Sequence, residues 1–367
     1  MVSSTDAGMS SAILARELPL NVLHRQAGAA MQAWLSWTVP ARFSDPKAEY
    51  QAIREACGLI DWSVIDAVEV QGADRIPFLH NLLSQDLKGL QAGLGRRAAL
   101  LTPNAKLLAD LLVLADTDRL LLLCLGTRTA TLLETLERYR IVEDVTARAL
   151  DLVCLALQGP GSPAVITQTF GAADHGTASG AHELLSFGSV RVRCIRQTIT
   201  GEPGYLLLAS APDAAELWRA LGKRARPVGW EELNVRRIEA GIPWYGIDMD
   251  DSTLLPETGL EAEAASQSKG CYIGQEVIAR LATYGSVSRK LLGWQCAGTT
   301  VPQAGDSIMK GEETIGAVTS GCVSFTFDRP IGLAYVKRPH YAQPGSIEIA
   351  RPNARLPGML LPLPFAG

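Results

Sequence analysis

Apolar and polar positions alternate in short runs along the first half of the chain. Residues 67–72 alternate as a half-buried strand does, and apolar positions then recur at helical spacing after Asp74, a capping residue. Two apolar runs flank Thr102-Pro103-Asn104-Ala105, whose residue types favour a turn. The pattern predicts the order strand, helix, three strands, helix over residues 67–72, 74–82, 96–102, 107–114, 120–125 and 127–139. This order is typical of an α+β domain.

A similar order returns after residue 150. The apolar pattern predicts a strand, a helix, two strands and a helix over residues 152–157, 162–170, 190–199, 205–209 and 214–221. The segments 70–74 and 157–161 both carry Gln-Gly directly after a predicted strand. This echo indicates an internal duplication.

The last third of the chain has a different pattern. A helix is predicted over residues 230–240, ended by Gly241, and residues 242–268 read as an extended connector. A short helix over 276–281 follows. From Lys290 onward short apolar runs alternate with Gly-rich turns, which predicts an antiparallel β-barrel of about 60 residues.

A length of 367 residues is enough for two or three domains. A partly flexible N-terminal segment, a first and a second α+β domain, a barrel and a tail are expected over residues 1–45, 46–148, 149–287, 288–352 and 353–367. A helix is also expected from Tyr50 to Ala56.

Composition narrows the class of protein. Apolar residues make up 47% and charged residues 20% of the chain, with a net charge of -4 and a pI near 5.8. A nucleic-acid-binding protein usually carries a basic face, so no direct nucleic-acid partner is expected. No apolar run approaches the roughly 20 residues that cross a bilayer, and the charged residues near the start of the sequence predict no secretory signal there. The protein is therefore expected to be soluble, cytoplasmic and monomeric.

The seven cysteines predict neither a disulfide framework nor a metal site. Their number is odd and no two are spaced as Cys-x-x-Cys. Most lie in apolar runs, where a thiol acts as a small packing residue.

The segment Lys269-Gly270-Cys271-Tyr272-Ile273-Gly274-Gln275-Glu276 has the densest chemistry in the chain. A thiol near a cation, here Cys271 near Lys269, can form a thiolate that acts as a nucleophile. The alternative is that Cys271 fills a tight loop. Lys269 and Arg280 are predicted to bind a carboxylate or phosphate of a ligand or, alternatively, to pair with Glu276 and Glu263, and Glu276 can also cap the helix that follows. Together the candidate cofactor-binding residues of this segment are Lys269, Tyr272, Gln275, Glu276 and Arg280.

Two carboxylates elsewhere are candidates for the same site. Asp110 lies within the apolar run 107–114, where it is either on the solvent face of an edge strand or an acid–base group. Glu202 lies between Gly201 and Gly204 in a predicted turn. It either completes that turn or accepts paired N–H donors from a heterocycle with both oxygens.

The segment from Lys269 to Arg280 resembles the K-G-C-Y-x-G-Q-E-x-x-x-R signature of YgfZ proteins. These are folate-binding relatives of the glycine-cleavage T protein, an aminomethyltransferase. Three further stretches resemble segments of that superfamily in the expected order: residues 200–205, residues 237–246, and residues 316–321 with 331–336 of the C-terminal barrel. The resemblance implies three domains in a ring around a central folate channel: two duplicated ferredoxin-like α+β domains and the small C-terminal barrel.

The resemblance also implies functional roles. Glu202 would help hold the pterin of tetrahydrofolate or a one-carbon derivative, Cys271 would be the reactive residue, and Asp110 lies near a catalytic aspartate of the T protein. The T-protein pattern has a double aspartate there, whereas this chain has Ala109-Asp110.

The main functional prediction from the resemblance is a folate-binding protein that supports iron–sulfur cluster assembly or repair and, through it, tRNA modification, with iron–sulfur proteins as partners. Whether it acts as a one-carbon or sulfur transferase or as a non-enzymatic scaffold is left open. The alternative is a folate-dependent aminomethyltransferase of the glycine-cleavage type.

Overall fold

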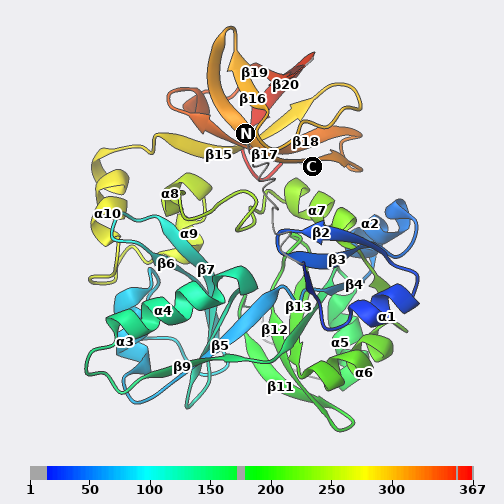
Figure 1. Ribbon diagram of the computed structural model, residues 1–367, viewed down its shortest axis with the longest axis vertical. Helices are drawn as coiled ribbons and strands as arrows, with labels where there is room; N and C mark the ends of the chain where they lie inside the picture. Colours follow the sequence, from blue (N-terminus) through cyan, green and yellow to red (C-terminus); the bar gives the residue numbers. More distant parts are fainter. Residues whose placement is uncertain (1–14, 172–177, 353, 366–367) are drawn as a thin grey trace, which may run out of the picture.

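The computed structural model describes residues 15–171, 178–352 and 354–365, in three lobes (Figure 1). Two α+β lobes lie side by side, and a β-barrel sits across one end of both. The fold therefore has the predicted α+β class and three-domain arrangement.

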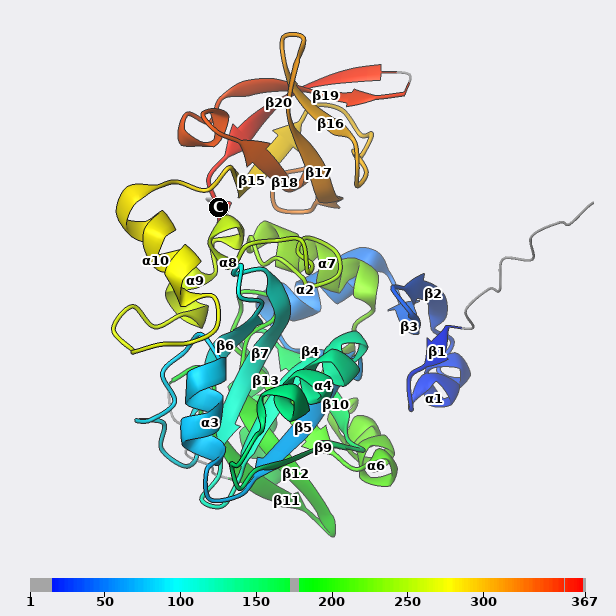
Figure 2. The same cartoon turned by 60° about the vertical axis from the view of Figure 1, so that its left-hand side comes forward.

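The first α+β lobe is a five-stranded sheet of order β6-β7-β8-β5-β9. Its elements are β5 (Ile65–Gln71), α3 (Arg75–Leu82), β6 (Gly95–Leu101), β7 (Leu107–Ala115), β8 (Leu120–Leu125), the 3-10 helix η1 (Gly126–Arg128), α4 (Thr129–Tyr139) and β9 (Thr146–Leu150). The predicted order of strands and helices is confirmed, with β9 added at the edge. Helices α3 and α4 cover one face and leave the other for the second lobe (Figure 2).

The second α+β lobe repeats this strand order. Its sheet runs β11-β12-β13-β10-β4-β14. The elements are β10 (Val153–Gln158), α5 (Ser162–Phe170), β11 (His182–Phe187), β12 (Val190–Arg196), β13 (Gly204–Ala209), α6 (Ala211–Leu221) and β14 (Arg226–Pro227). Strand β4 (Gly58–Asp61) is inserted between β10 and β14. Apart from this insertion the two sheets have the same topology, as a duplication predicts.

The described part of the N-terminal segment is folded. It contains β1 (Arg16–Glu17), α1 (Asn21–Gln26), β2 (Ala30–Trp34) and β3 (Trp37–Arg42), and α2 (Pro46–Glu55) follows, starting four residues before the helix expected from Tyr50 to Ala56. The strands form a small sheet, and the apolar side chains of Trp37 and Val39, with that of Leu18 directly after β1, are buried in the main core. Burial of these apolar side chains fixes a segment whose own pattern is weak. The expected fraying of the first dozen residues lies outside the described residues.

Helix α7 (Trp230–Glu239), predicted over residues 230–240, packs between the second lobe and the barrel. The connector after it was predicted to be extended but is partly helical, since α8 (Leu255–Thr258) and α9 (Glu261–Ala264) precede α10 (Gln275–Tyr284). The two added helices have one turn each, too short for a helical period to show in sequence.

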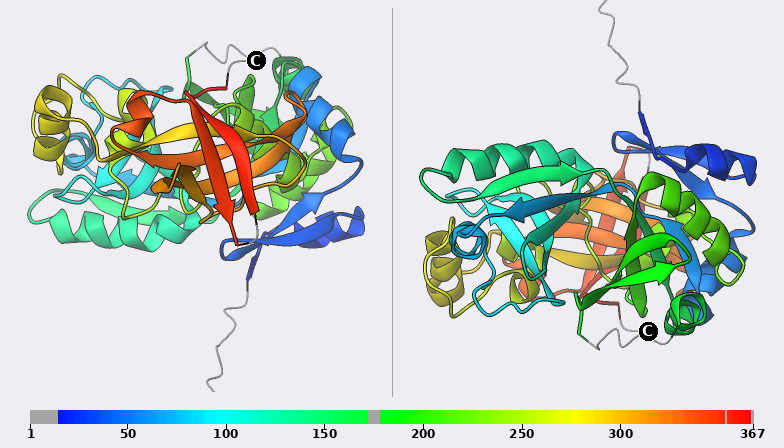
Figure 3. Two further views of the ribbon diagram at one scale, coloured as in Figure 1. Left: turned by 90° about the horizontal axis from the view of Figure 1, so that it is seen from above. Right: turned by 90° about the horizontal axis from the view of Figure 1, so that it is seen from below.

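The barrel closes with six strands in the order β15-β18-β17-β16-β19-β20. The strands are β15 (Arg289–Cys296), β16 (Ser307–Lys310), β17 (Glu313–Ser324), β18 (Arg329–Lys337), β19 (Ser346–Arg351) and β20 (Ala354–Leu361), with the 3-10 helix η2 (His340–Ala342) before β19. A correction concerns the predicted tail from residue 353, because β20 pairs with both β15 and β19 and closes the barrel. Figure 3 shows the barrel from above and the two α+β sheets from below.

One hydrophobic cluster joins the two α+β sheets. Leu114 and Leu123 of the first sheet pack with Ile195 and Leu206 of the second. The uncovered faces of the sheets therefore meet each other, and a cavity opens at this junction.

Candidate functional site

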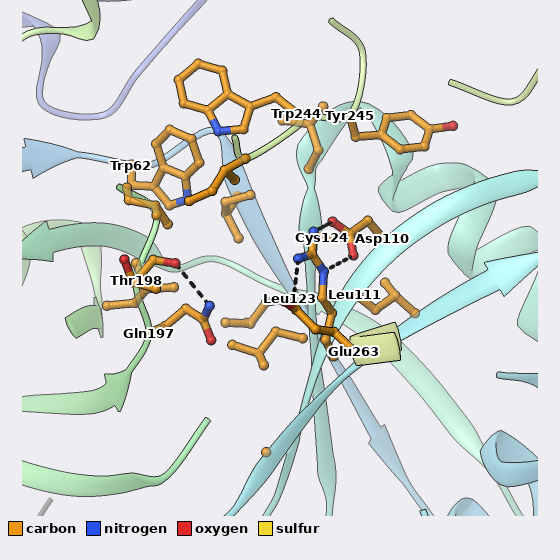
Figure 4. Close-up of a pocket in the computed structure, with 18 of the residues that line it drawn as sticks. Trp62, Asp110, Leu111, Leu123, Cys124, Gln197, Thr198, Trp244, Tyr245 and Glu263 are labelled. Atoms are coloured by element: carbon orange, nitrogen blue, oxygen red, sulfur yellow. Dashed lines mark hydrogen bonds and ion pairs between the residues drawn. The ribbon is translucent and has the colours of Figure 1, made fainter. Parts of the chain in front are cut away.

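A cavity of about 760 Å³ lies between the two sheets (Figure 4). Its walls come from β6, β7 and β8 of the first lobe and from residues 197–199 and Leu206 of the second. The N-terminal hairpin contributes Trp34, and the segment 242–245 after α7 completes the wall. Four parts of the chain that are far apart in sequence therefore build one site.

Aromatic rings form one part of the wall. The Trp62 and Trp244 rings lie 5.4 Å apart between centroids, and Trp34 is 5.8 Å from Trp244. Behind them Trp230 stacks on Trp62 at 4.8 Å. Packed rings keep fixed positions and offer flat apolar surfaces to a ligand.

Tyr245 extends the aromatic wall toward the first lobe. Its hydroxyl donates to the Leu107 carbonyl at 3.1 Å, and burial raises the pKa of Tyr245 to about 12. The Arg128 guanidinium lies 5.3 Å from the Tyr245 ring centroid, and its Nε donates to the Leu108 carbonyl. Within the described residues no carboxylate pairs with Arg128. Its remaining donors can therefore bind a ligand anion.

A cluster of three charged side chains forms the polar wall. Arg97 donates through Nε to Asp110 Oδ1 at 2.9 Å and through Nη2 to Asp110 Oδ2 at 2.6 Å. Its Nη1 donates to Glu263 Oε2 at 3.2 Å. Burial lowers the pKa of Arg97, but the charges and hydrogen bonds of Asp110 and Glu263 outweigh it and raise the pKa above its usual range.

Amide groups form a third part of the wall. Gln197 donates through Nε2 to the Thr198 carbonyl at 3.1 Å and accepts from Ser179 Oγ at 3.0 Å. The fully buried Gln158 fixes this segment, since its side chain donates to the Gln197 carbonyl and accepts from Ile199 N. Neutral donors and acceptors at fixed positions are what a polar heterocycle needs for recognition.

Cys124 of strand β8 borders the cavity, but its side chain packs in the cluster beneath α3 and α4, with Sγ 3.8 Å from Thr129 Oγ1. Burial raises the pKa of its thiol to about 12. The thiol is therefore protonated near neutral pH and is not a nucleophile there.

Of the predicted site residues, Asp110 faces the cavity. The pleat of β7 turns Ala109 toward the helices and Asp110 toward the second lobe, and Asp110 is 22% exposed. Glu202 is placed elsewhere. It accepts from Arg54 Nη1 at 2.5 Å and from Arg236 Nη2 at 2.9 Å, and it is not among the described residues that line the cavity.

The segment 269–280 contributes no side chain to the described cavity lining. Lys269 is buried and donates to the carbonyls of His80, Leu83 and Gln85. Burial lowers the pKa of Lys269 to about 8. Two of these carbonyls lie at the C-terminal end of α3, so Lys269 ties the segment to that helix.

The other residues of this segment divide between core and solvent. Tyr272 is buried in a small apolar cluster and lies 4.9 Å from the Lys269 amine. Gln275 Nε2 donates to the Lys269 carbonyl at 3.4 Å. Glu276 and Arg280 form an exposed ion pair one turn apart on α10, and Cys271 is exposed. The structure therefore does not bring Cys271 and Glu202 together in one recess.

Sequence reasoning missed most of the cavity wall. Arg97 could have been found, because strands paired across the predicted turn place it diagonally from Asp110. The tryptophans Trp34, Trp62 and Trp244 come from three separate segments, and no local pattern links them.

No group of three or more His, Cys, Asp or Glu side chains in the described parts of the chain is placed to hold a metal ion. Nor does any described helix have the length and hydropathy needed to span a bilayer.

Comparison with known proteins identifies the family. The model for the GCVT N-terminal domain matches residues 20–266, and the model for the glycine cleavage T-protein C-terminal barrel domain matches residues 289–366. The chain belongs to the glycine cleavage T-protein family. The predicted cofactor, tetrahydrofolate or a one-carbon derivative, agrees with this family.

Relatives of this chain from the T-protein family match it over nearly its whole length. Aminomethyltransferase from Bacillus licheniformis is 29% identical over 95% of this chain and 98% of its own length. Aminomethyltransferase from Streptomyces avermitilis is 30% identical over 90% of this chain and 91% of its own. The crystal structure of glycine cleavage system aminomethyltransferase T from Bartonella henselae is 25% identical, with a TM-score of 0.87 over 96% of this chain and 98% of that one.

These relatives overturn the main functional prediction. Support of iron–sulfur cluster assembly and tRNA modification, with iron–sulfur proteins as partners, is wrong, because relatives matched over 90% or more of the chain are named aminomethyltransferases. The prediction relied on the eight residues 269–276, whose side chains secure a loop or face solvent. The alternative, aminomethyl transfer, is the reading that the comparison favours.

Proposed function

We propose that this protein is a tetrahydrofolate-dependent aminomethyltransferase. The observation that carries the proposal is the carboxylate of Asp110, held in the wall of an aromatic cavity at the junction of the two α+β lobes. The family membership, shown over residues 20–266 and 289–366, supports the same activity.

The residues of the cavity fit a folate. A volume of about 760 Å³ lies within the usual range of about 300–1,000 Å³ for small-molecule sites. Trp62 and Trp244 would pack against the ligand's flat rings, and Gln197 would hydrogen-bond a heterocycle. Arg128 would bind a carboxylate of the ligand's glutamate portion.

The wall residues have separate tasks in this reaction. When bound, tetrahydrofolate supplies the nitrogen that accepts the one-carbon unit. Asp110 would place a negative charge beside the positively charged amine of the donor, where water-free surroundings strengthen the interaction. The tryptophan rings would exclude water from the reacting groups.

Ammonia release from an aminomethyl-lipoyl carrier protein, measured with and without tetrahydrofolate, tests the proposal. Wild-type protein is expected to release ammonia only when the folate is present. Asp110→Asn should lower the rate by about 10²–10⁴-fold, the usual contribution of such a group. Asp118→Asn, at an exposed position in the turn after β7, is the matched control and should keep the wild-type rate. Absence of folate-dependent ammonia release from the wild-type protein would reject the function.

Two finer assignments are also proposals. Membership of the YgfZ branch and a reactive role for Cys271 rely on residues 269–276, and pterin binding by Glu202 relies on the turn it occupies. The exposure of Cys271 supports a reactive role for its thiol. The ion pairs of Glu202 with Arg54 and Arg236 count against pterin binding by Glu202. Cys271→Ala and Glu202→Gln in the same assay separate these roles from that of Asp110.

A further inference from the structure

Arg97 lines the cavity, and the register between β6 and β7 determines its position. Ala99 pairs with Asp110 across the β6–β7 hairpin and Arg97 pairs with Leu112. Arg97 and Asp110 are thus diagonal neighbours on one face of the sheet, close enough for long side chains to meet. That face is the one turned toward the second lobe.

Arg97 donates three side-chain hydrogen bonds, and the acceptor of each is a carboxylate oxygen. Two go to the two oxygens of Asp110, and the third goes to Glu263 of α9. The Arg97 and Asp110 side chains are 26% and 22% exposed, whereas Glu263 is 70% exposed. A bidentate arginine fixes the plane of a carboxylate as well as its charge, which a lysine cannot do.

The charges of this cluster do not cancel. Two carboxylates and one guanidinium give the cluster a net charge of -1, while Arg96 and Arg128 carry positive charge elsewhere in the lining. The negative charge is therefore local to the cluster, and a cationic group of the ligand is favoured beside it. The amine of an aminomethyl group is such a cation at neutral pH.

From this geometry we propose that Arg97 is a positioning residue. Its guanidinium holds the Asp110 carboxylate in one orientation, with Glu263 as the second anchor, so that the carboxylate faces the cationic amine of the one-carbon donor. The inference rests on the proposed function for the identity of that amine. The orientation itself can be tested without any activity.

The activity test compares Arg97→Gln, Arg97→Lys and Glu263→Gln. Arg97→Gln should lower kcat by about 10- to 100-fold, the cost of a misplaced reacting group, with KM for the folate little changed. Arg97→Lys should have part of the wild-type rate, because lysine keeps the positive charge but lacks the two parallel N–H donors of the guanidinium. Glu263→Gln should have a smaller effect, since Asp110 keeps both of its bonds. Arg138→Gln, at an exposed arginine of α4, is the control and should match the wild type.

A double variant separates positioning from an independent role. In the Asp110→Asn background, Arg97→Gln should cost little more, because residues that act as a unit are not additive. An equal loss in both backgrounds, or a loss confined to KM, would overturn the proposal.

Crystal structures of the wild type and Arg97→Gln give the readout that needs no activity. We expect the Asp110 carboxylate to leave its wild-type orientation in the variant. An unchanged carboxylate overturns the positioning role, even if the wild type proves to be an aminomethyltransferase. Conversely, a wild-type protein without ammonia release rejects the function, and the Asp110 orientation still decides the role of Arg97. If Arg97→Gln does not fold, Arg97→Lys, which removes the two parallel N–H donors and keeps the charge, serves for the same comparison.

Discussion

Burial, together with a neighbouring carboxylate, changes the chemistry of Glu232, on the first turn of α7. Its side chain is 4% exposed, and its Oε2 atom has no hydrogen-bond partner among the described residues. The nearby Glu49 carboxylate is occupied by the backbone N–H groups of Phe43 and Gly229. Burial, followed by the charge of Glu49, raises the pKa of Glu232 to about 7.

A Glu232→Gln variant is therefore expected to be more stable than the wild type at high pH. The folded pKa of about 7 lies above the ordinary 4.5, so the folded state binds more protons between these values. The wild type should lose stability as pH rises from about 4.5 to 7, and the variant should not. The difference should reach about 1–3 kcal/mol at pH 8 and be small at pH 4.5.

Urea unfolding at pH 4.5 and pH 8 measures this difference. Glu216→Gln changes an exposed carboxylate of α6 and should behave as the wild type does. A stability difference that is equal at both pH values would contradict the prediction.

At the scale of elements, Lys269 joins a loop to a helix. The last carbonyls of a helix have no partner within it, and Lys269 supplies one for the end of α3. A segment rich in the residue types found at functional sites can thus have a structural role, and the residue pattern alone could not distinguish the two.

Replacing Lys269 by Met should lower the free energy of unfolding by about 1–3 kcal/mol, since buried carbonyls lose a charged donor. Cys271→Ser, two residues away and exposed, is the matched control and should leave stability within about 0.5 kcal/mol. Chemical denaturation of both variants provides the comparison. A Lys269→Met protein as stable as the control would show that the three hydrogen bonds contribute no net stability.

Helices and strands with a strong hydrophobic period of their own were predictable from the sequence. Those whose structure depends on pairing with neighbouring segments were not. The alternation of residues 67–72 and the paired runs around residues 102–105 predicted β5, β6 and β7. Strands β9 and β11 lie at sheet edges, where pairing with one neighbour determines the structure more than the strand's own pattern does. Strand β20 contains Pro357 and Gly358, which read as a tail in isolation.

One residue of the candidate site, Asp110, was predicted, because its carboxylate stood out within an apolar run, and Arg97 could have been added from the pairing of the two predicted strands. The remaining wall depends on the packing of separate segments. Trp34 reaches the cavity because Leu35 takes a left-handed conformation at the hairpin tip, and Trp244 because its segment returns across the junction of the lobes. Such long-range contacts leave no trace in local periodicity.

At the scale of the whole molecule, Asp248 links the barrel to the wall of the cavity. The carboxylate is fully buried and accepts from Arg237 and from the Trp244 backbone N–H. Its other oxygen accepts from Thr319 and Ser320 of β17 at 2.6 and 2.7 Å. One side chain therefore connects α7, the tryptophan-bearing segment and the barrel.

We expect Asp248→Asn to destabilise the fold and to weaken folate binding together. Neutralising Asp248 leaves the Arg237 guanidinium, 1% exposed, as a buried charge without its counter-ion, which costs about 3–5 kcal/mol. Because the same carboxylate holds the Trp244 backbone, the aromatic wall should loosen and the Kd for tetrahydrofolate should rise. Urea unfolding gives the first quantity, and quenching of tryptophan fluorescence by tetrahydrofolate gives the second. Asp251→Asn, three residues further along and exposed, should change neither. If Asp248→Asn lowered stability while the Kd stayed at its wild-type value, the barrel would be anchored independently of the cavity.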